Sequence, residues 1–164
     1  LRLSSAASDV YKRQLLFFFL LFYLHVANVY SDIIKPNTKI EPYNVVEIQL
    51  ISLKNNDKPD KDFGIEQTWE FAHPENKINT GPLNNFKKML KNEIYSILLN
   101  HKDHKIEEIY NNKKIAIYDV IILGSDNFYY EFKWQVERYD GKGSLNNCWL
   151  TTAVSNPVSL GASI

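Results

Sequence analysis

The stretch that decides the fold is residues 128–137, FYYEFKWQVE, in which apolar and polar side chains alternate. Successive residues of a β-strand point to opposite faces of the sheet, so the two sets of positions separate onto two faces. The core-facing set is expected to be Phe128, Tyr130, Phe132, Trp134 and Val136. The other set, at the odd positions of 129–137, is expected to face water. The stretch therefore predicts a long antiparallel strand with one buried and one wet face.

The neighbouring stretches predict further strands of the same sheet. Residues 114–123 are rich in Ile and Val and are apolar on both faces apart from Asp119, which is typical of a central strand. Residues 105–110 predict an edge strand, and residues 148–154 predict a final strand. Residues 124–127 and 139–143 are rich in turn formers and are expected to connect these strands.

Before this sheet the apolar residues follow a helical period. Helices are predicted over 44–55, over 64–72, from Pro82 onward, and over the short apolar run 94–99. In the first of them Gln49 is expected to point away from the apolar side. Pro74 is expected to end the second, because proline disfavours the α conformation of the residue before it. Residues 76–82 are expected to form a loop. Helices followed by an antiparallel meander indicate an α+β fold, with a curved sheet wrapped against the helices in a cone.

Short pieces between residues 45 and 152 carry a family resemblance. They are Val46-Glu47-Ile48-Gln49-Leu50, Asn55-Asn56-Asp57, Gly64-Ile65, Phe71-Ala72-His73-Pro74-Glu75-Asn76-Lys77, Thr80-Gly81-Pro82, Phe86, Met89-Leu90, Tyr95, Leu98-Leu99-Asn100-His101 and Cys148-Trp149-Leu150. In this order and spacing they resemble an uncharacterised domain family of bacteria, algae and plants within the nuclear transport factor 2-like (cystatin-like) superfamily. The resemblance implies that cone-shaped fold. It implies no activity, because the family has none established.

The composition limits the classes of protein to consider. The chain has 164 residues, which suits one domain, with 19 basic and 19 acidic residues and one cysteine. Zero net charge argues against a nucleic-acid binder that works by bulk electrostatics. A single cysteine excludes an intrachain disulfide and a multi-cysteine zinc site.

The two ends of the chain differ in amino-acid composition from its middle. Residues 1–14, LRLSSAASDVYKRQ, resemble a translated sequencing adapter, and without them 16 basic and 18 acidic residues remain. Residues 15–24 are ten apolar or aromatic residues in a row, the length of a signal-peptide core, and small residues precede a possible cleavage point after Ser31. Residues 15–31 are therefore predicted to be a signal peptide or targeting segment for the secretory pathway or a plastid. The alternatives are an uncleaved membrane anchor or a buried helix. Residues 32–41 are expected to be a linker, 42–155 the domain, and 156–164 a frayed or foreign tail.

Few residues suggest chemistry, since no phosphate loop, nucleophile elbow or metal signature occurs. Asp119 lies in an apolar strand, where a raised pKa would make it a general base; alternatively it pairs with Lys133 across the sheet. His73 is a second acid–base candidate, or a helix cap. Tyr130 is a third, because some superfamily enzymes pair an acid with His or Tyr inside the cone.

Binding candidates are Trp69, Tyr130, Trp134 and Lys77. The aromatic residues form a core or line a pocket, and Lys77 would favour an anionic group beside a helix start.

Other polar or reactive residues are expected to be structural. Cys148 is expected to be buried and inert, and 101–104 (HKDH) to be a solvated loop rather than a metal site. Lys87, Lys88 and Lys91 are expected to form a solvated helix face.

Two main hypotheses of function remain open. One is a non-enzymatic domain that binds a small apolar ligand or a protein partner, without cofactor, metal or nucleic acid. The other is an isomerase- or dehydratase-type enzyme with acid–base groups in the cone. A structural or homodimerising role is a third alternative.

Overall fold

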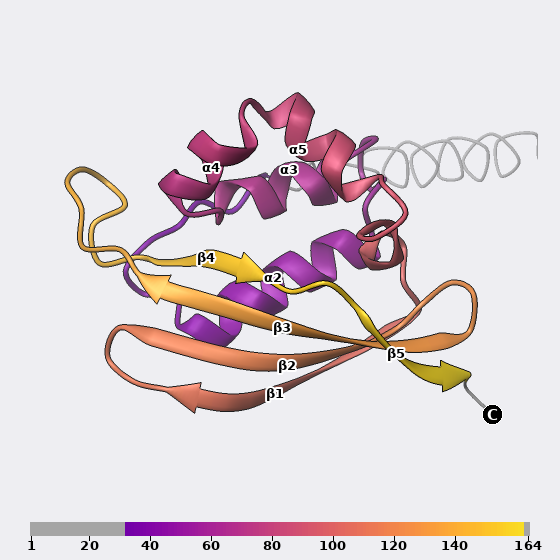
Figure 1. The fold of residues 1–164 in the computed structure, drawn as a ribbon. Coiled ribbons are helices and arrows are strands. Elements are labelled where there is room, and N and C mark those ends of the chain that lie inside the picture. Colours follow the sequence, from indigo (N-terminus) through magenta and orange to yellow (C-terminus); the bar gives the residue numbers. More distant parts are fainter. Residues whose placement is uncertain (1–31, 163–164) are drawn as a thin grey trace, which may run out of the picture. The chain divides into compact units, whose positions relative to one another are not determined.

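The alternating stretch lies in the middle of an antiparallel sheet (Figure 1). The computed structural model describes residues 32–162. Its strands are β1 (Asp103–Asn111), β2 (Ile115–Leu123), β3 (Phe128–Arg138), β4 (Trp149–Val154) and β5 (Val158–Ala162). They pair in the order β1-β2-β3-β4, and β5 pairs with the beginning of β3, whose end pairs with β4. The predicted sheet and the predicted α+β class are therefore confirmed.

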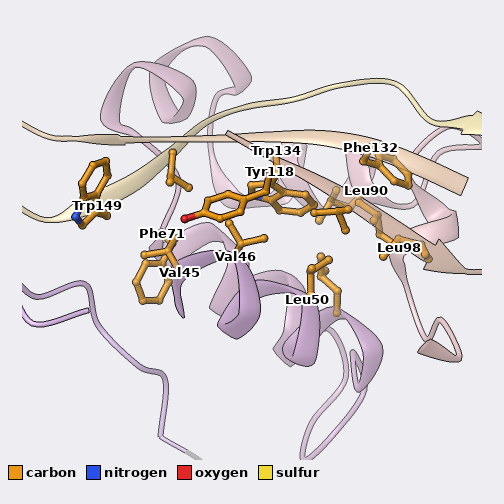
Figure 2. Packing of buried hydrophobic residues seen from close by; sticks show 14 of the residues in the cluster. Val45, Val46, Leu50, Phe71, Leu90, Leu98, Tyr118, Phe132, Trp134 and Trp149 are labelled. Atoms are coloured by element: carbon orange, nitrogen blue, oxygen red, sulfur yellow. The ribbon is translucent and has the colours of Figure 1, made fainter. Parts of the chain in front are cut away.

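Helices precede the sheet in the chain. They are α2 (Pro42–Lys54), α3 (Phe63–Glu70), α4 (Pro74–Thr80), α5 (Leu83–Leu90) and a 3₁₀ helix (Ser96–Leu98). Figure 1 shows α3, α4 and α5 grouped together, with α2 between this group and strands β1, β2 and β3. The core forms where α2 meets the sheet: Val46 and Leu50 lie opposite Tyr118 and Trp134 in Figure 2, all at most 1% exposed. Burying each such side chain contributes about 1.5–3 kcal/mol.

A close contact joins α2 to α3. A Cβ atom at Gly64 would lie 2.1 Å from the backbone oxygen of Ser52, so only glycine allows this approach. The buried Asn56 fixes the connection, because its backbone oxygen accepts from the Gly64 N–H at 2.9 Å and its Oδ1 accepts from the Ile65 N–H at 3.1 Å. The pieces Asn55-Asn56-Asp57 and Gly64-Ile65 thus serve helix packing.

The buried face of β3 is shorter than predicted. Phe132, Trp134 and Val136 are buried, but Phe128 is 41% exposed and Tyr130 is half-buried. The first residues of β3 form the hairpin with β2 and pair with β5, whereas the core cluster of buried residues takes only Phe132, Trp134 and Val136 from this strand. Regular alternation therefore specifies the strand but not how far along it the core extends.

The prediction for Pro74 was wrong, and so was the loop predicted over residues 76–82 as far as Thr80. The preceding helix α3 already ends at Glu70, and Pro74 starts α4 instead of ending a helix. A proline suits the first helical turn because its missing N–H has no partner there in any case. His73 caps this helix, since its Nδ1 accepts from the Glu75 N–H at 3.2 Å. No residue of α4 is buried, so the segment lacked the apolar stripe by which helices are predicted.

Three smaller expectations also need correction. Gln49 points into the protein and is 1% exposed, whereas Ile51, expected on the apolar side, is 50% exposed. The predicted helix 94–99 is a single 3₁₀ turn. Just before this turn, Asn92 Oδ1 accepts from the backbone N–H groups of Ile94 and Tyr95. Residues 158–162, expected in a frayed tail, form β5, because the edge of β3 beside residues 128–131 is open to pairing.

The chain before the first helix is tied to the domain. The buried Gln67 side chain accepts from the Ile34 N–H at 2.7 Å and donates to the Ile34 oxygen at 2.8 Å. The adapter-like residues 1–14 and the targeting segment 15–31 lie outside the described residues. Among the helices that are described, none has the length and apolar character needed to cross a membrane.

Candidate ligand pocket between the helices and β4

A pocket of about 260 Å³ lies between the helices and β4. The apolar residues of its lining come from or adjoin three helices, the 3₁₀ turn, β3 and β4, and include Leu53, Trp69, Ala72, Phe86, Met89, Leu90, Leu98, Trp134 and Val154. The rings of Trp69 and Phe86 lie 5.0 Å apart and form one wall. The lining includes fully buried residues as well as the exposed Ala153, so the pocket extends from the core to the surface.

The floor of the pocket is a neutral hydrogen-bond network centred on Gln49. Its Oε1 accepts from the Thr151 hydroxyl at 2.7 Å and from Trp134 Nε1 at 3.1 Å. Its Nε2 donates to the backbone oxygen of Thr68 at 3.1 Å. All four residues are at most 6% exposed. Because buried polar groups are costly unless they are paired, this network keeps an amide in the core and carries no charge.

The mouth of the pocket is held by α4. Asn76 Nδ2 donates to the backbone oxygens of Thr151 and Thr152, at 3.1 and 2.7 Å. These two bonds attach α4 to β4, and Asn76 and Thr80 line the pocket.

Lys77 lies beside this mouth. Its Nζ is 5.4 Å from the centre of the Trp69 ring and donates to the Glu70 oxygen at 3.3 Å. Burial lowers the pKa of Lys77 below its ordinary value. The ammonium is thus engaged by a ring face and a carbonyl, and Lys77 is outside the lining itself.

The structure separates the predicted binding residues. Trp69 and Trp134 line the pocket and Lys77 flanks it. Tyr130 is elsewhere: its hydroxyl donates to Asp126 Oδ2 at 2.6 Å in the β2–β3 hairpin, and this bond raises the pKa of Tyr130.

The acid–base candidates do not converge. Asp119 pairs with Lys133, whose Nζ is 2.7 Å from Oδ1 and whose pKa this bond raises, so the cross-strand pairing considered as the alternative is what the structure has. The buried residues of β2 are the even-numbered ones, so Asp119 is on the opposite face of the sheet from the core. His73 caps α4, and its ring meets that of Tyr139 edge to face at 5.4 Å.

Residues 101–104 are not the solvated loop that was expected. His101 is 2% exposed; its Nδ1 lies 2.7 Å from the Leu98 oxygen and its Nε2 lies 2.8 Å from Nδ1 of His104. Burial lowers the pKa of His101 to about 4 and lowers that of His104. Within residues 32–162, no group of three His, Cys, Asp or Glu side chains could hold a metal ion. The two imidazoles thus form a pair at the start of β1, in which His101 is buried and His104 is half-buried.

The remaining candidates are structural. Cys148 is 1% exposed, as predicted, and burial raises the pKa of its thiol. The solvated face expected at α5 is partly an ion-pair network with the residues at and near the start of α3. Lys87 lies 2.7 Å from Glu66 and Lys91 lies 2.7 Å from Asp62. The hydrogen bond from Lys91 lowers the pKa of Asp62, which is nearly buried.

Sequence reasoning missed Gln49 and Thr151, the centre of the floor. One signal was available, because Gln49 lies midway between Val45 and Leu53 at a helical spacing of four residues. A polar side chain at such a position lies on the buried face of the helix and needs a buried hydrogen-bond partner. No family model, curated protein or solved structure matches the chain.

Proposed function

We propose that this chain is a non-enzymatic domain that binds a small apolar ligand in the pocket between the helices and β4. The observation that carries the proposal is the pocket itself, with apolar and aromatic walls and a polar floor whose groups bond to one another. Binding sites for small molecules are typically apolar with a few convergent polar groups. Apolar cavities of moderate size also take up apolar molecules readily.

The placement of the acid–base candidates favours binding over catalysis. General acid–base chemistry needs a titratable group within hydrogen-bond reach of the reacting atoms. Asp119 and Tyr130 are outside the pocket lining. Asp119 pairs with Lys133, and the Tyr130 hydroxyl donates to Asp126. His73 caps α4. This separation supports a ligand-binding domain rather than an isomerase or dehydratase.

We also propose that the domain belongs to the nuclear transport factor 2-like cone folds. Two features support this: helices precede an antiparallel sheet, and α2 packs against the face of the sheet that holds the core. An experimental structure in which the strands leave α2 uncovered would contradict it.

Native mass spectrometry of the purified chain tests the binding function. The expected result is a co-purifying small molecule that is lost in Val154→Phe, because Val154 lines the pocket and a larger side chain there takes up ligand volume. Val158→Phe is the matched control, since Val158 is 60% exposed on β5 and outside the lining. Wild-type protein that stays empty after purification and after exposure to apolar compounds would contradict the proposal.

A further inference from the structure

We propose that the pocket selects an uncharged ligand that has a compact apolar body and one hydroxyl group, which donates to Asn76 at the mouth. This inference rests on the proposed binding function and names the chemical class of the ligand. It follows from three features of the pocket: its charge, its size and its free hydrogen-bond acceptors.

Charge is the first feature. None of the residues lining the pocket is an Asp, Glu, Lys, Arg or His. The nearest cation considered above, Lys77, already donates to the Glu70 oxygen and lies over Trp69. A carboxylate or ammonium ion in this lining would lose its hydration without gaining an opposite charge, which is strongly unfavourable. The pocket therefore discriminates against charged ligands.

Size is the second feature. The pocket volume of about 260 Å³ is below the roughly 300–1,000 Å³ of sites for drug-sized molecules. Trp69, Phe86 and Trp134 supply flat aromatic surface, which suits a ring system better than a long flexible chain. A one- or two-ring skeleton fits both observations.

The third feature is the pair of acceptors at the mouth. Both amide hydrogens of Asn76 have a partner, because Nδ2 donates to the oxygens of Thr151 and Thr152. The amide is thereby fixed, and among the described residues neither Asn76 Oδ1 nor the Thr80 hydroxyl has a hydrogen-bond partner. The floor offers fewer free hydrogen-bond acceptors, since Gln49 Oε1 already accepts two hydrogen bonds. A ligand hydroxyl is thus best placed at the mouth, with its rings toward the floor.

Isothermal titration of the full chain with four compounds of one skeleton tests this at pH 7. The compounds are naphthalen-1-ylmethanol, 1-naphthoate, naphthalen-1-ylmethylammonium and 1-methylnaphthalene. The alcohol is expected to bind best, at least tenfold tighter than either ion and about fivefold tighter than the hydrocarbon, as one hydrogen bond provides. Asn76→Ala is expected to remove the advantage of the alcohol over the hydrocarbon. Asn79→Ala, an exposed position of the same helix, is expected to keep it.

Each outcome decides one part of the proposal. An ion that binds as well as the alcohol overturns the neutral class while leaving the pocket function in place. Equal affinity for alcohol and hydrocarbon, or an alcohol preference that survives Asn76→Ala, overturns the hydroxyl contact. Binding of none of the four compounds, together with an empty chain in native mass spectrometry, overturns the proposed function and this inference with it. Thermal melts of both variants separate a lost contact from a lost fold.

Discussion

The network in the pocket floor predicts a specific loss of stability when Gln49 is replaced by leucine. Leucine has a similar size, but it removes an oxygen that accepts two hydrogen bonds and an N–H that donates one. Thr68 O keeps a second donor, the Phe71 N–H at 3.2 Å, and the Thr151 hydroxyl is free to rotate. The loss of stability that remains comes from Trp134 Nε1, because its only remaining acceptor among the described residues is Thr151 Oγ1 at 3.4 Å. One poorly paired buried donor costs about 1–3 kcal/mol, so Gln49→Leu is expected to lower the free energy of unfolding by about 2 kcal/mol.

Urea unfolding followed by tryptophan fluorescence and by circular dichroism measures this loss. The double variant Gln49→Leu with Thr151→Val removes the hydroxyl as well, and the two single changes should not add, because the two side chains share a 2.7 Å bond. Exposed Ile51→Leu on the same helix is the control and should change stability little. A Gln49→Leu protein as stable as wild type, or strictly additive single changes, would refute the assigned network.

Three further predictions follow from the described contacts. Gly64→Ala is expected to lower the free energy of unfolding in urea by about 2 kcal/mol or more, because the clash of the new Cβ with the Ser52 backbone outweighs a gain of about 1 kcal/mol in helix propensity. An unchanged unfolding midpoint would contradict the α2–α3 contact. The free energy of unfolding is expected to fall by about 3 kcal/mol as pH drops from 6.5 to about 4, because burial lowers the pKa of His101 to about 4 and the unfolded state protonates first. His101→Asn should flatten that part of the profile, and a flat wild-type profile would count against the buried imidazole. Lys91→Met is expected to raise the pKa of Asp62 and cost about 1 kcal/mol, whereas exposed Lys88→Met should cost almost nothing, as chemical denaturation of the two variants would show.

Much of the fold could be predicted from local patterns, and the exceptions have a common cause. Strands β2 and β3 and helix α2 have enough apolar residues at the right period to be recognised alone. Helix α4 has no apolar stripe, and β5 is only five residues long with none of them buried; each has a partner elsewhere in the chain. For α4 the partners are the backbone oxygens of β4, and for β5 the partner is the open edge of β3.

The site was predictable only in its apolar part. Trp69 and Trp134 follow the periodic patterns and were expected at a core or pocket. The hydrogen bond between Gln49 and Thr151 joins residues 102 positions apart in the chain, so no local pattern reports it. Asp119 shows the opposite case, because its pairing with Lys133 was one of the two interpretations that the strand pattern allowed, and the structure has that pairing.

A single irregularity in β4 organises both ends of the pocket. Between β3 and β4 the register shifts, so that Gln135 faces Ala153 while Val136 faces Thr151, and Thr152 is the extra residue. Such a bulge changes the direction of the side chains and interrupts the ladder of backbone hydrogen bonds. On the inner side the Thr151 hydroxyl reaches Gln49 in the floor. At the mouth the oxygens of Thr151 and Thr152 accept from Asn76. Because Thr151 contributes to both the floor and the mouth, a change that regularises β4 should alter ligand binding and the attachment of α4 together.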